Sequence, residues 1–193
     1  HASPEHALAL VAGSAREFAA AGDGVLLLGT QTGSEWKVVE HAVPDAAFSA
    51  IGAEGSVFVA LERVGRAHVA RAGAWTTATI DADAELRSVA FGDGTWLASG
   101  ERASEGALYV ARDPAGAWTR VATPSAAGGL HAAVHALGRF YVAGSEGHVL
   151  VSRDAKTWED SAALESWAGV PTSRAFGTRD AIAYLADGLY VAG

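Results

Sequence analysis

Four tryptophans recur along the chain at intervals of about 40 residues, a period typical of repeat architectures. They are Trp36, Trp75, Trp118 and Trp158. An apolar run, in most copies with an aromatic residue and a glycine at its end, precedes each of them. These runs occupy residues 18–22, 57–61, 96–100 and 140–144, and a fifth copy occupies residues 189–193. The recurrence predicts a chain built from repeated units.

Each unit contains four short apolar runs separated by turn residues. Links such as Gly92-Asp93-Gly94 join the first two runs, and glycine reaches the positive φ that tight hairpins require. The runs are rich in Val, Leu, Phe, Tyr and Trp and have the length of strands. Such a unit buries both its faces only when neighbours stack on it. We therefore predict an all-β fold, a β-propeller of four-stranded antiparallel blades. A linear β-solenoid is the alternative, although its repeats are shorter.

The repeat boundaries divide a single domain, residues 1–193, into about four and a half blades. Full blades are expected at residues 7–43, 44–84, 85–126 and 127–166, and a half blade at residues 180–193. Residues 1–6 are too few to supply the two strands that the half blade lacks. We expect another protein chain, or residues outside this sequence, to complete the fifth blade, because an open strand edge favours association.

Composition excludes several classes of protein. Half of the 193 residues are hydrophobic, which argues against disorder, and no apolar run is long enough for a membrane-spanning helix. The formal net charge of −8 argues against a nucleic-acid partner. The chain has no cysteine, which excludes disulfides and thiolate chemistry. Because the sequence opens at His1 rather than at methionine, either a leader has been removed or the sequence is a piece of a longer chain. A cleaved secretory signal would explain this start, and we expect a secreted, periplasmic or cell-surface location.

One segment resembles a known repeat family. Ser152-Arg153-Asp154-Ala155-Lys156-Thr157-Trp158 is similar to the Asp box, Ser-x-Asp-x-Gly-x-Thr-Trp, of bacterial Asp-box (BNR-type) propeller repeats. It is one residue shorter than the box and lacks the glycine. Residues 89–100 resemble the first hairpin of the same repeats. The resemblance implies that Ser152, Asp154, Thr157 and Trp158 form a structural turn between the third and fourth strands of a blade.

The resemblance implies a fold rather than an activity. Propellers of this kind occur in sialidases, photosystem assembly factors, cellulose-degrading enzymes and uncharacterised surface proteins. Sialidases need an arginine triad, a Tyr–Glu pair and an acid/base Asp, and the Arg-Ile-Pro motif that marks the first arginine is missing here. The four tyrosines fall within predicted strands, where we expect them to pack.

No motif predicts a catalytic, metal or cofactor site. His131 and His135 have a spacing that would join two zinc ligands on a helix. On a predicted strand their Cα atoms lie about 13 Å apart, too far to share one ion. Asp81, Asp83 and Glu85 alternate in the link between the second and third blades, and we expect a solvated acidic loop there rather than a calcium site.

The candidate binding loop is the longest irregular segment, residues 159–180. It contains Trp167, Arg174, Phe176 and Arg179. Loops of this length are often functional, and Trp and Arg are enriched at binding hot spots. The same predicted face carries mixed charges, which we expect to form ordinary soluble surface. They are Glu62, Arg63, Arg66, Glu101, Arg102, Glu105 and Glu146.

Three functions follow as hypotheses. The first is a non-catalytic binding or scaffold propeller within a larger exported protein or assembly. The alternative is a carbohydrate-active propeller with a glycan ligand: paired carboxylates in a cleft would favour part of a glycoside hydrolase, and an exposed Trp167 would favour a lectin. The third, an assembly chaperone, would show a large patch of one charge, and the interspersed charges disfavour it.

Overall fold

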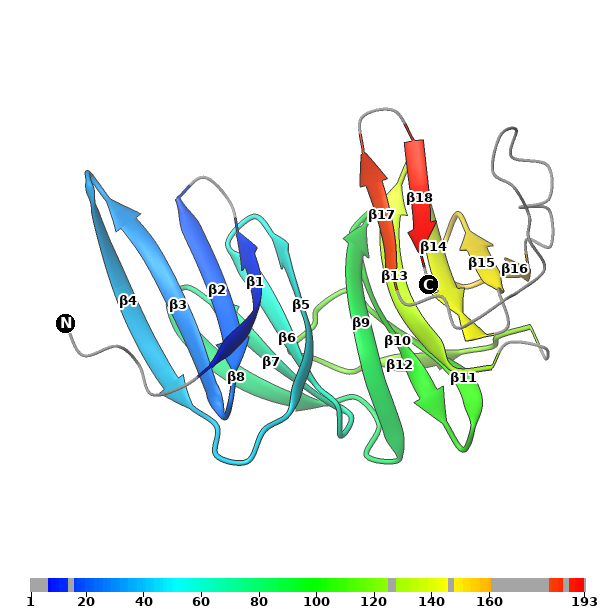
Figure 1. Cartoon of the computed structure of the whole chain (residues 1–193), viewed down its shortest axis with the longest axis horizontal. Coiled ribbons are helices and arrows are strands. Elements are labelled where there is room, and N and C mark those ends of the chain that lie inside the picture. The colour runs from blue at the N-terminus through cyan, green and yellow to red at the C-terminus, as the bar shows by residue number, and fades with distance from the viewer. Residues whose placement is uncertain are drawn as a thin grey trace.

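The computed structural model describes residues 7–13, 16–124, 128–145, 148–160, 181–185 and 188–192. These residues form four four-stranded sheets and one two-stranded sheet, all antiparallel (Figure 1). The prediction of an all-β fold with four-stranded antiparallel blades is confirmed. No helix in the described part of the chain is long and apolar enough to cross a membrane.

The strands follow one another in the order of the sequence. The first blade contains β1 (Leu8–Gly13), β2 (Glu17–Gly22), β3 (Val25–Thr32) and β4 (Glu35–Ala42). The second contains β5 (Phe48–Glu54), β6 (Val57–Glu62), β7 (Arg66–Arg71) and β8 (Ala74–Thr79). The third contains β9 (Ala84–Gly92), β10 (Thr95–Arg102), β11 (Glu105–Ala111) and β12 (Thr119–Val121). The fourth contains β13 (Leu130–Ala136), β14 (Arg139–Gly144), β15 (Val149–Ser152) and β16 (Glu159–Asp160). A hairpin of β17 (Ala181–Leu185) and β18 (Gly188–Ala192) follows.

Each blade is a simple meander in which every strand pairs with the next. The first strands of consecutive blades contact one another, so that β1, β5, β9, β13 and β17 form the inner side of an arc (Figure 1). The blade of β1–β4 and the hairpin β17–β18 lie at opposite ends of this arc in the view of Figure 1. The described strands of these two ends make no comparable contact with each other.

Tight turns close the hairpins. Gly92 pairs with Thr95, and both intervening residues, Asp93 and Gly94, have positive φ. The same holds for Leu137 and Gly138 between β13 and β14. Positive φ at both positions is the hairpin turn whose twist matches that of the flanking strands. The glycine-containing links of the sequence therefore mark real turns.

The hydrophobic core lies between blades. Ala19 and Leu28 of the first blade pack against Phe58 and Ala70 of the second. A larger cluster joins the second and third blades, and another joins the third and fourth. Because each sheet has an apolar face toward each neighbour, burial requires stacking, as the repeat predicts.

Candidate functional site

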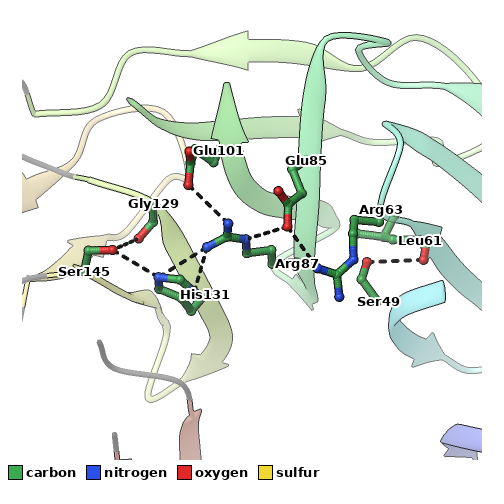
Figure 2. Close-up of polar contacts among 9 residues, drawn as sticks. All are labelled: Ser49, Leu61, Arg63, Glu85, Arg87, Glu101, Gly129, His131 and Ser145. Atoms are coloured by element: carbon green, nitrogen blue, oxygen red, sulfur yellow. Dashed lines mark hydrogen bonds and ion pairs between the residues drawn. The ribbon is translucent and has the colours of Figure 1, made fainter. Parts of the chain in front are cut away.

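Arg87 stands at the centre of a polar network on the inner strand β9 of the third blade (Figure 2). Its Nη2 lies 3.2 Å from Glu101 Oε2 and its Nε lies 3.3 Å from Glu85 Oε1. The Arg87 side chain is 23% exposed. Two carboxylates thus share one guanidinium whose planar fork offers donors in several directions.

The network crosses into the fourth blade through His131 (Figure 2). Arg87 Nη1 donates to His131 Nδ1 over 2.9 Å, and His131 Nε2 lies 3.1 Å from Ser145 Oγ. Ser145 Oγ in turn donates to the carbonyl oxygen of Gly129 over 3.2 Å. Arg87 Nη1 also lies 3.4 Å from His131 Nε2. Because a guanidinium can only donate, the imidazole accepts from Arg87.

The network also reaches the second blade. Arg63, just after β6, places Nη1 3.1 Å from Glu85 Oε1. The hydrogen bond from Arg87, together with the charges of Arg87 and Arg63, lowers the pKa of Glu85 against the opposing effect of burial. Glu85 is thus held as a carboxylate. Ion pairs of alternating charge connect the second and third blades, and the hydrogen bond from Arg87 to His131 extends the network to the fourth.

A second network lies beside the first, in the link between β8 and β9. Arg102 Nη2 lies 3.1 Å from Asp83 Oδ2, and Tyr109 Oη donates to Asp81 Oδ2 over 2.8 Å. Burial and the Asp81 carboxylate raise the pKa of Tyr109. The acidic residues that the sequence predicted as a solvated loop are therefore structured: Asp81, Asp83 and Glu85 all pair with arginines.

One charged residue of this face is buried. Glu62, at the end of β6, has a side chain that is 4% exposed, and its Oε1 lies 2.5 Å from His68 Nε2. His68 Nδ1 lies 3.2 Å from Thr77 Oγ1 on the neighbouring strand. The expectation of ordinary soluble surface is wrong for Glu62. Its carboxylate is held inside the blade because the imidazole satisfies it.

Both carboxylates of the third blade in this network are engaged with Arg87. A glycosidase needs one carboxyl that stays protonated to act as the acid. Glu85 and Glu101 are both ion-paired to Arg87, and the pKa of Glu85 is lowered rather than raised. No group of three or more His, Cys, Asp or Glu side chains suited to a metal ion occurs among the residues described. His131 and His135 turn to different partners, His131 to Arg87 and His135 to Asp93.

The Asp-box-like segment forms a tight turn between β15 and β16. Asp154 Oδ1 accepts from the amides of Lys156 and Thr157, each over 2.8 Å, and from Ser152 Oγ over 3.1 Å. These hydrogen bonds, led by that of the Thr157 amide, lower the pKa of Asp154 to about 2. The Trp158 indole donates to the carbonyl of Ala155 over 3.2 Å. In the third blade the Trp118 indole likewise donates to a turn carbonyl, that of Pro114 four residues before it, over 2.9 Å.

The repeated tryptophans of the second, third and fourth blades each pack toward the preceding blade. Trp75 contacts the cluster shared with the first blade, Trp118 the cluster shared with the second, and Trp158 the cluster shared with the third. Trp36 belongs to the first blade and is 46% exposed. Its ring contacts Phe18, with centroids 5.2 Å apart.

Among the described residues, no further blade covers the outer face of the first blade. Phe18 occupies the place in β2 that Phe58, fully buried against the first blade, occupies in β6. Two valines share that face according to the strand register, Val11 at 72% exposure and Val38 at 50%. We call Val11, Phe18, Trp36 and Val38 the first-blade outer face.

Most of the predicted binding loop, residues 159–180, lies outside the described part of the chain. Trp167, Arg174, Phe176 and Arg179 lie outside the described residues, as does Glu146. The sequence did not single out Arg87 or Ser145. The signal for Arg87 is a charged residue within a strand on the inner side of the arc, since such a residue needs a partner.

Comparisons with known proteins support the β-propeller fold. The structure titled "YCF48 bound to D1 peptide" matches with a TM-score of 0.67 and 17% identity, over 100% of this chain and 62% of that one. The computationally designed Ika4 protein matches with a TM-score of 0.63 and 14% identity, over 78% of this chain and 93% of that one. Apo AztD from Citrobacter koseri matches with a TM-score of 0.57 and 15% identity, over 79% of this chain and 45% of that one.

Identities this low show a shared fold alone. The chain spans 62% of the YCF48 chain. No family model matches the sequence. No curated protein matches it either.

Proposed function

We propose that this chain is a non-catalytic binding or scaffold propeller that joins another protein chain through the first-blade outer face. The proposal rests on the exposure of Trp36, because its counterparts in the next three blades all pack against a preceding blade. Contiguous exposed apolar side chains mark interaction surfaces, and tryptophan is enriched at their centres. The YCF48 propeller, of the same fold, has a peptide in its structure.

The surface that fits this face best is another blade of the same kind. In blades two to four, small and branched apolar residues of the preceding sheet cover the equivalent positions. A second copy of the chain offers such a sheet. We therefore propose a second copy of the chain as the partner, with one of its blades packing where a preceding blade would lie.

We also propose that the chain belongs with the Asp-box propellers. The supporting observation is the turn at residues 152–158, in which Asp154 caps two backbone amides and Trp158 donates to the turn carbonyl of Ala155. Ala155 has a φ of 58°, in the left-handed region that glycine would enter without strain. The turn thus keeps the hydrogen bonding of a box although the glycine is missing.

The experiment measures the mass of the purified full chain by light scattering over a wide concentration range. We expect an assembly that the paired substitution Val11→Glu with Val38→Glu dissociates, because charges on an apolar interface must be desolvated. The matched control is Leu137→Glu, which places the same charge at a residue that is 69% exposed and outside the face. A protein that is monomeric throughout, or an assembly that the paired substitution leaves intact, would overturn the proposal.

A photoreactive residue at position 38 tests the same contact directly. It should form cross-links between copies, and the same residue at position 137 should not. Circular dichroism of the Val11→Glu/Val38→Glu protein distinguishes dissociation from unfolding, because a dissociated chain retains its strand spectrum and an unfolded chain loses it.

A further inference from the structure

A groove lies between the third and fourth blades, at the end of the sheets away from Arg87. It has a volume of about 410 Å³ and is lined by Thr95, Arg112, Thr119, Phe140, Arg153 and Lys156, among others. Its walls come from the turns that follow β9, β11 and β15. About six residues of β9, roughly 20 Å of strand, separate this end from Arg87. The groove is thus distinct from both surfaces discussed above.

Three cations of the groove have no carboxylate partner. Arg112, Arg153 and Lys156 form no ion pair with any residue in the described ranges. The arginines of the Arg87 end behave differently. Arg63, Arg66, Arg87 and Arg102 each lie within 4 Å of a carboxylate. These three cationic side chains converge on one groove of a chain whose net charge is −8.

The carboxylates of the groove are engaged elsewhere. Asp154 accepts from two amides of its own turn, and Asp93 Oδ2 lies 3.1 Å from His135 Nε2. Neither is within ion-pair distance of Arg112, Arg153 or Lys156. The three cationic side chains are therefore available to a ligand, and the hydroxyls of Thr95 and Thr119 lie on the same walls.

We propose that this groove binds a small, multiply charged oxyanion, that is, a ligand bearing carboxylate or phosphate groups. Guanidinium groups bind both kinds of oxyanion through paired N–H donors, and the lysine ammonium adds a point charge. The volume falls within the range of small-ligand sites, about 300–1,000 Å³. The proposal does not depend on the association of chains through the first blade.

The test titrates the full-length protein with citrate and, separately, with inorganic pyrophosphate at constant ionic strength, followed by calorimetry. We expect binding of at least one of the two. Arg112→Gln and Arg153→Gln should each weaken it about tenfold, the loss of one charge-assisted contact. The matched control is Lys37→Gln, which removes a cation from β4 of the first blade and should leave binding unchanged. Unfolding curves of each variant confirm that it is folded.

The two ligands distinguish the source of the oxyanion. Binding of citrate alone assigns a carboxylate ligand, and binding of pyrophosphate alone assigns a phosphate ligand. Absence of binding by both would overturn the proposal. It would also be overturned if Lys37→Gln weakened binding as much as Arg153→Gln, because the anion would then respond to overall charge and not to the groove.

Discussion

Arg87 Nη1 lies 2.9 Å from His131 Nδ1, across the boundary between the third and fourth blades. The two residues are 44 positions apart in the sequence. Glu85 and Glu101 hold the same guanidinium within the third blade. Arg87 therefore links the third blade to the fourth by a polar contact, in addition to the apolar cluster that the two blades share.

We predict that Arg87→Ala lowers the free energy of unfolding by about 1–3 kcal/mol, because it leaves two partly buried carboxylates without their shared partner. Urea unfolding measures the change. The control is Arg63→Ala, which removes an arginine that pairs with the same Glu85 but is 60% exposed, and it should cost less than about 0.5 kcal/mol. Equal losses for both variants would contradict the central role of Arg87.

The buried pair of Glu62 and His68 should be sensitive to the loss of one partner. Glu62→Ala leaves Nε2 of the His68 imidazole without its partner in a blade interior, and we expect a loss of about 2–4 kcal/mol in the free energy of unfolding. Replacing both residues with leucine should recover part of that loss, because no polar group is then left unsatisfied. Arg66→Ala is the control, since Arg66 lies 3.7 Å from Glu62 but is 53% exposed. If the double variant is no more stable than Glu62→Ala, the pairing argument is wrong.

Leu137 should be a site where substitution stabilises the protein. It has a φ of 53° in the turn between β13 and β14, and it is 69% exposed. Leu137→Asn creates the Asn-Gly pair that this turn favours and should add about 1 kcal/mol. Thermal unfolding measures the gain. Leu137→Ala removes the same apolar surface without relieving the backbone, so it should show no comparable gain, and an equal gain would point to solubility instead.

Acid should weaken the turn at Asp154 in a defined range of pH. The pKa of this carboxyl is about 2 in the folded chain, against an ordinary value of 3.8, because the amides of Thr157 and Lys156 donate to it. A depressed folded pKa stabilises the fold fully above the unfolded value, and the contribution disappears as pH falls through the folded value. The difference in unfolding free energy between wild type and Asp154→Asn should therefore shrink between pH 3.8 and about 2.

The control for this pH dependence is Lys37→Gln, which changes no carboxyl. Its difference from wild type should stay constant over the same range, because a lysine does not titrate there. Direct titration of the Asp154 carboxyl by NMR gives a second reading. A midpoint near the ordinary 3.8 would contradict the proposed role of the turn amides.

The sequence alone determined the repeat and the strands. Turn residues at fixed offsets, such as Asp93-Gly94, specify hairpins through local backbone preferences, so they can be read without knowing the fold. Blade stacking then follows, because a small four-stranded unit cannot bury two apolar faces by itself. The fold class was predictable for this reason.

Only the tertiary structure decided what each repeated residue does. Trp36 and Trp75 occupy matching positions, yet Trp75 packs between blades while Trp36 is 46% exposed, because no described blade precedes the first. The pairing of Arg87 with His131 was likewise not readable from either segment. Local patterns act over a few residues, whereas contacts between blades join positions about 40 residues apart and depend on which faces meet.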